Sequence, residues 1–297
     1  MNPCGLKTVG LVFGRKLIDP LWTSTAFYKM LLMNLQLLAR TKRWQTRTYA
    51  MDDLEPVRIL EEIRGDVQAR ELDAVIWGAF LGHGLCESTH KMNLPTVGFA
   101  QGIADHDTIL SIDMNSLIHA GVDFLVKAGC GRVWVVGSPG GGVEDILLKR
   151  TAEYGLDFRM ENIIGYDLES SDLFAYEMAG ANSAEKLLKT CDHISLKDGV
   201  MVLDDVIACG FVNQMIEMGF HPGRNFHLIS HCNKGAPTLY GLTEGMALLE
   251  IDSAEIAMKL LNRLDELMGG VTHGDVYSIR PNLILPRLKG GIHETVP

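Results

Sequence analysis

Short apolar runs alternate with amphipathic segments along almost the whole chain. The run at residues 8–13 is short and unbroken, which suits a strand buried on both faces of a parallel sheet. The segment 57–68 instead repeats apolar residues at intervals of three and four, as a helix with one buried face does. This order of strand, helix and strand predicts a doubly wound α/β fold.

Two series of such elements follow one another. The first comprises strands at 8–13, 44–49, 74–77 and 96–99, with helices at 24–38, 57–68 and near 85–92. The second comprises strands at 109–112, 133–136 and 162–164, with helices at 117–128, 143–154 and 176–189. We therefore expect two similar α/β lobes in succession.

Residues 200–233 form a further predicted strand–helix–strand unit, with polar residues at the carboxyl ends of its strands. An apolar run at 200–203 is followed by Asp204 and Asp205, and we expect Asp205 to cap a helix that ends at Gly219. A second strand at 226–229 leads to His231. Ligands of open α/β sheets bind outside the carboxyl ends of the strands, so Asp204 and His231 are candidate ligand contacts.

The C-terminal part of the chain predicts a return to the first lobe. After Asn233 we expect a loop, a short strand at 238–240, a helix at 253–267 and a final apolar run at 276–285. A helix and strands placed after the second lobe suggest that the chain crosses back.

The composition agrees with a two-lobed protein that does not itself bind nucleic acid. The chain has 297 residues, 47% of them hydrophobic, and single cores stop growing at roughly 250–300 residues. With 37 acidic and 27 basic residues its formal charge is −10, so it should repel DNA and anionic membranes.

The cysteines and the N-terminus favour a cytoplasmic protein. The six cysteines are scattered without the spacing of a disulfide framework, so we expect them to be reduced. No stretch approaches the roughly 18 apolar residues of a membrane-spanning helix, and no apolar signal-peptide region precedes Cys4.

The order of motifs resembles the effector-binding core of the lactose/galactose repressor (LacI/GalR) family. KTVGLVF followed by DPLW resembles the family's first strand and its following signature, and LDAVIWG and LPTVGFA resemble the next strands. SIDMNSLIHAGVDFLVKAGCGRVWVVGSP, the unit at 200–233 and the tail PTLYGLTEGMALLEIDSAEIAMKLLNRLDELMGG then follow in the family's order.

The resemblance implies a type I periplasmic-binding-protein-like fold, with two doubly wound parallel-sheet lobes joined by three crossovers. The N-terminal lobe would comprise residues 7–110 and 234–269, and the C-terminal lobe residues 111–233 and 270–289, with crossovers near Leu110, Asn233 and Gly270. It also implies a homodimer that holds a small-molecule effector in the cleft between the lobes.

The chain departs from the family pattern at three places. The family's helix-turn-helix domain is absent before the first strand, so the chain is either the trimmed core of a regulator or a sensor that does not bind DNA. The arginine that often clamps the ligand is missing from residues 140–143, and the aspartate of the family's GYD motif falls at Cys232. We therefore expect an uncommon mode of effector recognition.

Candidate ligand contacts stand at the strand ends of both lobes. Aromatic faces with a few hydrogen-bond acceptors suit a sugar or a similar small polar ring. Trp22 could equally pack under its loop, and Phe174 and Tyr176 could belong to the core. The candidates are Asp19, Trp22, Phe80, His83, Gln101, Ser138, Phe174, Tyr176, Asp204 and His231.

We expect no metal, cofactor or catalytic centre. His83, Cys86 and His90 would need a fourth ligand to hold zinc. The glycine-rich segment 137–143 is neither GxGxxG nor a P-loop. The leading hypothesis is therefore the ligand-sensing core of a transcriptional regulator that reaches DNA through a domain missing here, and the alternatives are a transport sugar-binding protein of the same fold and an enzyme.

Overall fold

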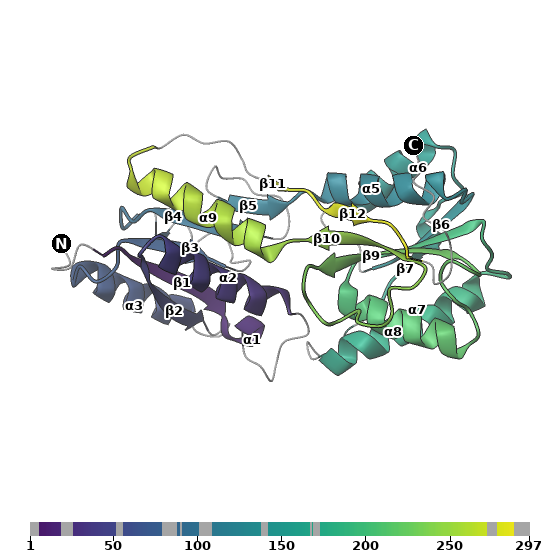
Figure 1. Ribbon diagram of the computed structural model, residues 1–297, viewed down its shortest axis with the longest axis horizontal. Helices are drawn as coiled ribbons and strands as arrows, with labels where there is room; N and C mark the ends of the chain where they lie inside the picture. The colour runs from purple at the N-terminus through teal and green to yellow at the C-terminus, as the bar shows by residue number, and fades with distance from the viewer. Residues whose placement is uncertain are drawn as a thin grey trace. The chain divides into compact units, whose positions relative to one another are not determined.

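A computed structural model describes residues 6–18, 26–51, 56–78, 88–89, 91–100, 109–137, 142–166, 168, 173–271 and 278–287 of the chain. The chain divides into two compact units, Met1–Asp113 with Asp252–Ile279 and Met114–Ile251 with Arg280–Pro297. Figure 1 shows the elements of each unit. None of the described helices is long and apolar enough to cross a membrane.

The first unit is built on a parallel six-stranded sheet with the strand order β11-β5-β4-β3-β1-β2. Its strands are β1 (Thr8–Gly14), β2 (Gln45–Met51), β3 (Ala74–Trp77), β4 (Thr96–Ala100), β5 (Ile109–Ile112) and β11 (Ser278–Ile279). Its helices are α1 (Arg15–Ile18), α2 (Phe27–Thr41), α3 (Pro56–Gln68) and α9 (Ser253–Met268).

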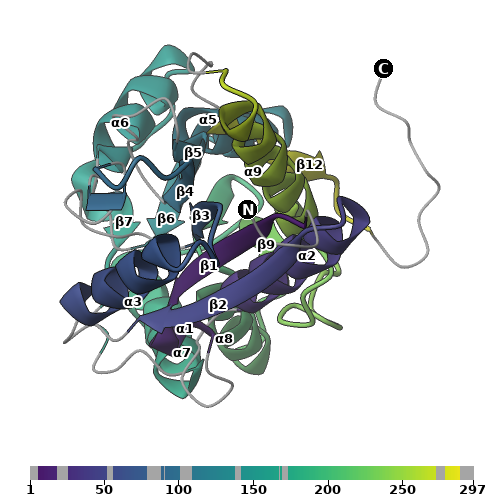
Figure 2. The ribbon, with the colours of Figure 1, turned by 90° about the vertical axis from the view of Figure 1, so that its left-hand side faces the viewer.

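Helices cover both faces of this sheet because the side chains of a strand point alternately to either side. Val12 of β1 packs in a cluster with Ile59 and Ile63 of α3. On the other face the rings of Phe27 in α2 and Phe99 in β4 lie 5.3 Å apart. Figure 2 shows α2 and α9 together on one side of the strands and α3 on the other.

Helix α9 belongs to the first unit although it follows the second unit in sequence. It packs along α2, where Nδ2 of Asn34 donates a hydrogen bond of 2.9 Å to Oγ of Ser253. Asp252 caps the helix by accepting from the amides of Ala254 and Glu255. The return of the chain to the first unit, with a helix at this place, is as predicted.

The second unit repeats the architecture with the strand order β12-β10-β9-β8-β6-β7, in which only β12 runs antiparallel. Its strands are β6 (Arg132–Val136), β7 (Ile163–Ile164), β8 (Asp198–Val202), β9 (His227–Asn233), β10 (Met246–Ile251) and β12 (Asn282–Ile284). Its helices are α5 (Met114–Lys127), α6 (Val143–Glu153), η1 (Met160–Asn162), α7 (Leu173–Thr190) and α8 (Asp205–Glu217).

Helices α7 and α8 pack backbone to backbone through two glycines. A Cβ atom at Gly180 would lie 2.1 Å from the carbonyl oxygen of Ile207, and one at Gly210 would lie 1.9 Å from that of Glu177. Both distances are far below van der Waals contact, so only glycine fits at these positions. This approach seats α8 against the sheet, and α8 begins at the polar edge described below.

The structure confirms the predicted fold class, with two doubly wound lobes and three crossovers, but corrects where the chain crosses. The crossovers fall after Asp113, Ile251 and Ile279, whereas we predicted Leu110, Asn233 and Gly270. The second position differs most, because residues 246–251 form β10 in parallel register with β9 and so keep the chain in the second unit. The short strand predicted at 238–240 is a turn, and the helix predicted near 85–92 lies largely outside the described residues.

Candidate ligand-binding site at the carboxyl ends of β8 and β9

The carboxyl ends of β8 and β9 lie side by side in the second sheet. Val202, the last residue of β8, is in register with Ser230 of β9, so the residues that follow β8 meet the last three residues of β9 at one edge. This is the edge at which open α/β sheets bind their ligands. Four polar side chains gather there, namely Asp204, Asp205, His231 and Asn233.

Asp204 is the N-cap residue of α8. Its backbone is extended, with φ −140° and ψ 137°, and its Oδ1 accepts hydrogen bonds from the amides of Val206 at 2.8 Å and Ile207 at 3.0 Å. We predicted Asp205 in this role, and the prediction is wrong because Asp205 already has helical geometry and is the first residue of the helix. Both capping bonds end at Oδ1, so capping engages one of the two carboxylate oxygens.

The carboxyl group of Asp204 lies in an environment that disfavours its charge. Burial raises its pKa above the usual value, and the neighbouring carboxylate of Asp205 raises it further. The amide of Ile207 and the positive charge of His231 act in the opposite direction, with the smaller effect. The strand register places Asp204 and His231 at the same edge of the second sheet.

Asp205 turns inward and binds Asn233. Its side chain is 2% exposed, that of Asn233 is 5% exposed, and Oδ2 of Asp205 accepts a 2.9 Å hydrogen bond from Nδ2 of Asn233. This bond joins the first turn of α8 to the last residue of β9. Neither residue was predicted as a ligand contact.

Two polar atoms at this edge are buried and have no hydrogen-bond partner among the described residues. They are Nδ1 of His231 and Oδ1 of Asn233. The two residues are two apart in β9, so their side chains point to the same face of the sheet. An unsatisfied buried donor or acceptor costs about 1–3 kcal/mol, so these two atoms are candidates for contact with a ligand or a bound water.

Cys232 lies between these two residues and points to the opposite face. It packs against the apolar cluster formed by β9 with α7 and α8. Burial raises the pKa of its thiol to about 12, with further contributions from the charges of Glu250 and Asp205. The residue that stands where the family pattern has an aspartate is thus a partly buried thiol that packs against the core.

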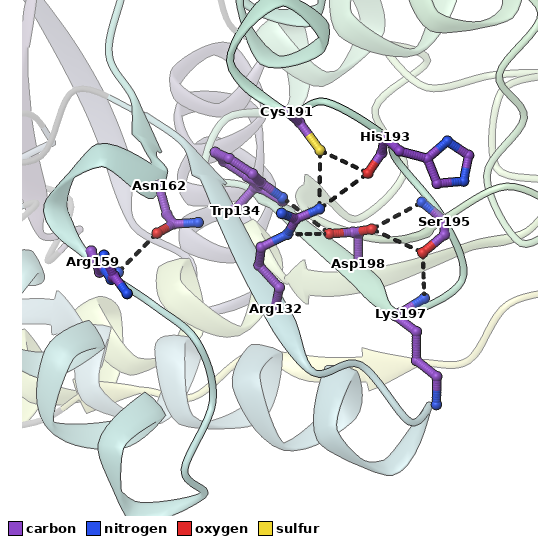
Figure 3. Close-up of polar contacts among 9 residues, drawn as sticks. All are labelled: Arg132, Trp134, Arg159, Asn162, Cys191, His193, Ser195, Lys197 and Asp198. Carbon is purple, nitrogen blue, oxygen red and sulfur yellow. Dashed lines mark hydrogen bonds and ion pairs between the residues drawn. The ribbon is translucent and has the colours of Figure 1, made fainter.

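A second polar cluster lies at the amino ends of β6 and β8 and has a different character (Figure 3). Buried Asp198 accepts hydrogen bonds from Nε of Arg132, Nε1 of Trp134, and both the amide and Oγ of Ser195. Arg132 also donates to Sγ of Cys191 at 3.0 Å. Every polar group of Asp198 is satisfied by the chain itself, so this cluster is a structural link.

Only some of the remaining predicted contacts lie within the described residues. Phe174 is 71% exposed at the start of α7, which leaves its ring free to stack on a ligand, whereas Tyr176 packs partly into the core. The structure brings together Asp204 and His231. The other predicted contacts lie outside the described residues, namely Asp19, Trp22, Phe80, His83, Gln101 and Ser138.

The zinc candidates His83, Cys86 and His90 also lie outside the described residues. Within the described ranges, no group of three or more histidine, cysteine, aspartate and glutamate side chains is placed to hold a metal ion. The four described cysteines, Cys130, Cys191, Cys209 and Cys232, are free thiols.

The fold is that of a two-lobed α/β protein with a polar edge at the carboxyl ends of β8 and β9, and comparisons with known proteins agree on the fold. No protein-family model and no curated protein sequence matches the chain. A regulatory protein of the LacI family from Chloroflexus aggregans has a similar structure, with a TM-score of 0.77 at 16% identity over 95% of this chain and 98% of that one.

Further solved regulators have the same fold. The Escherichia coli transcriptional repressor ascG gives a TM-score of 0.71 at 17% identity over 94% of this chain and 98% of its own. The transcriptional regulator CelR, in complex with cellobiose, gives 0.72 at 14% identity over 94% of this chain and 83% of its own. The fold implied by the resemblance to the lactose/galactose repressor family is therefore confirmed.

Proposed function

We propose that this chain is the effector-sensing core of a LacI-like transcriptional regulator. The observation that carries the proposal is the structural similarity to solved transcriptional regulators, two of them named as LacI regulators, over 94–97% of this chain. No catalytic activity is part of the proposal.

In this proposal the effector is a small polar molecule, a sugar or sugar derivative, held between the lobes. Asp204 and His231 contribute ligand contacts from the second unit, and the exposed ring of Phe174 stacks on the ligand. The contacts predicted from the first unit, among them Asp19 and Trp22, complete the site.

Effector binding would control DNA indirectly. A ligand that contacts both lobes favours the conformation in which those contacts form, and so shifts the population of lobe arrangements. The formal charge of −10 makes the core a poor DNA ligand, so in this proposal a separate helix-turn-helix domain contacts the DNA. We further propose that the core is a cytoplasmic homodimer.

Thermal unfolding in the presence of candidate effectors tests the proposal. A ligand at 100-fold its Kd stabilises the folded state by about 2.7 kcal/mol, so binding raises the Tm measurably. The screen should contain sugars, sugar phosphates, polyols and purines, and sedimentation at micromolar concentration should report a dimer. A Tm that no compound changes, a monomer in solution, or turnover of any compound would contradict the proposal.

A further inference from the structure

The Asp205–Asn233 pair fixes which end of the Asn233 amide points away from α8. An ionised carboxylate only accepts hydrogen bonds, so the amide must present its Nδ2 group to Oδ2 of Asp205, at 2.9 Å. A rotated amide would place two acceptor oxygens against each other. Oδ1 of Asn233 is thereby held as a buried acceptor without a partner among the described residues.

This acceptor shares its surroundings with other acceptors and with negative charge. Asp204 and Asp205 are adjacent at the same edge, and their carboxylate oxygens accept hydrogen bonds from the amides of α8 and from Asn233. Nδ1 of His231, on the same face of β9, is likewise buried without a hydrogen-bond partner among the described residues. A ligand that donates hydrogen bonds matches this set, while a phosphate or carboxylate group meets repulsion.

We propose that Asn233 contacts the effector directly, through Oδ1, and that Asp205 is the positioning residue that orients its amide. The ligand class that this arrangement takes is an uncharged, hydroxyl-bearing molecule such as an unmodified sugar, in preference to its phosphate or its acid. The inference rests on the proposed function, because it deepens the description of the same site.

The test measures the affinity of the wild-type chain and four variants for matched pairs of probes by titration calorimetry. The probes are glucose, galactose and cellobiose, each with its phosphorylated form and its aldonic acid. Asn233→Leu has nearly the same size but no acceptor. Asn213→Leu is the matched control, since Asn213 is an exposed residue of α8 away from this edge.

Two further variants test the positioning role of Asp205. Asn233→Asp places two carboxylates in contact and should weaken binding. The double variant Asp205→Asn with Asn233→Asp restores an amide–carboxylate pair with the partners exchanged, and should recover the affinity for the neutral sugar. A merely structural role would lower the ligand affinity only in variants that also lose stability, so urea unfolding of the same variants separates the two roles.

The expected result is that a neutral sugar binds, that its phosphate and acid bind at least tenfold more weakly, and that Asn233→Leu loses about tenfold in affinity while Asn213→Leu does not. Binding by the phosphates or acids alone, or an Asn233→Leu variant with unchanged affinity, overturns this inference and leaves the proposed function standing. If Asn233→Leu does not fold, Asn233→Asp and the double variant provide the test. Unchanged affinity in Asn233→Asp, or no recovery of affinity in the double variant, then overturns the inference. A chain that binds no probe in the panel and none in the wider effector screen overturns both.

Discussion

Nε of Arg132 lies 2.5 Å from Oδ1 of Asp198, and this ion pair joins the first residues of β6 and β8. Asp198 is 2% exposed, whereas the Arg132 side chain is 34% exposed and also lies over the ring of Trp134. The pair thus anchors the amino edge of the second sheet with its negative charge fully inside and its positive charge at the surface.

Substitution of Asp198 should lower the free energy of unfolding by an amount that depends on pH. Asp198→Ala leaves Arg132 and Trp134 without their acceptor, and we expect a loss of about 3 kcal/mol in the free energy of unfolding at pH 7. Burial raises the pKa of Asp198, but the hydrogen bonds from Arg132 and Ser195 lower it by more. The net result is a pKa below the usual value of 3.8.

Because the folded-state pKa is the lower one, the stabilisation is present above pH 3.8 and is lost as the pH falls through the folded-state value. Urea unfolding at pH 7, 5 and 3 should show the wild type and Asp198→Ala converging at the lowest pH. Asp192→Ala, at an exposed position nearby, serves as the control. An equal difference between wild type and variant at all three pH values would contradict the assignment.

Substitutions at Asp204 should separate its capping role from its charge. Asp204→Ala removes the acceptor for two amides and should lower the free energy of unfolding by about 1 kcal/mol. Asp204→Asn keeps an oxygen at the cap but carries no charge, so it should cost less at pH 7.

The raised pKa of Asp204 reverses the usual pH dependence of an aspartate. Its folded-state pKa lies above the unfolded one, so its contribution is most favourable at low pH and is lost as the pH rises through the folded-state value. Chemical unfolding of wild type and Asp204→Asn should therefore show the variant gaining in relative stability from pH 4 to pH 7. A relative stability that is constant, or that falls, would show that the carboxyl group has an ordinary pKa.

Two glycine-to-alanine substitutions should have opposite effects. Gly180→Ala drives a methyl group to within 2.1 Å of the Ile207 carbonyl oxygen, and the forced separation of α7 and α8 should cost about 3 kcal/mol. Gly65 is exposed in α3 with no atom within 4 Å of an added Cβ, so Gly65→Ala should stabilise the chain by roughly 0.5–1 kcal/mol. Thermal or urea unfolding measures both, and a tolerated Gly180→Ala would contradict the close packing.

The buried thiol of Cys130 and the partly buried thiol of Cys232 should resist alkylation in the folded protein. Burial raises the pKa of each thiol from 9.0 to about 12, so at pH 8 each has roughly a thousandfold less thiolate than an ordinary cysteine. Iodoacetamide labelling followed by peptide mass spectrometry should find both unmodified until the chain is unfolded in urea. Rapid labelling of Cys232 in the native protein would show that this residue is open to solvent.

Much of the fold could be predicted because each of its signals lies within one segment. The buried strand at Val200 and Val202 and the helix that carries Ile207 and Phe211 each display their own period, and the order of segments then restricts the topology. β10 was missed although an apolar run bounded by Gly245 and Asp252 marks it, and this omission displaced the predicted crossover by a whole strand.

The sequence by itself determined that two doubly wound lobes follow one another and that Asp204 and His231 stand at strand ends, since both conclusions depend on local periodicity. The tertiary structure alone decided that Asp204 caps α8, that Asp205 holds the amide of Asn233, and that Gly180 and Gly210 let two helices touch. The physical reason is that hydrogen bonds and close contacts between distant segments depend on distances that only packing sets. Local pattern shows where a polar side chain emerges, but its partner is fixed by the folded chain.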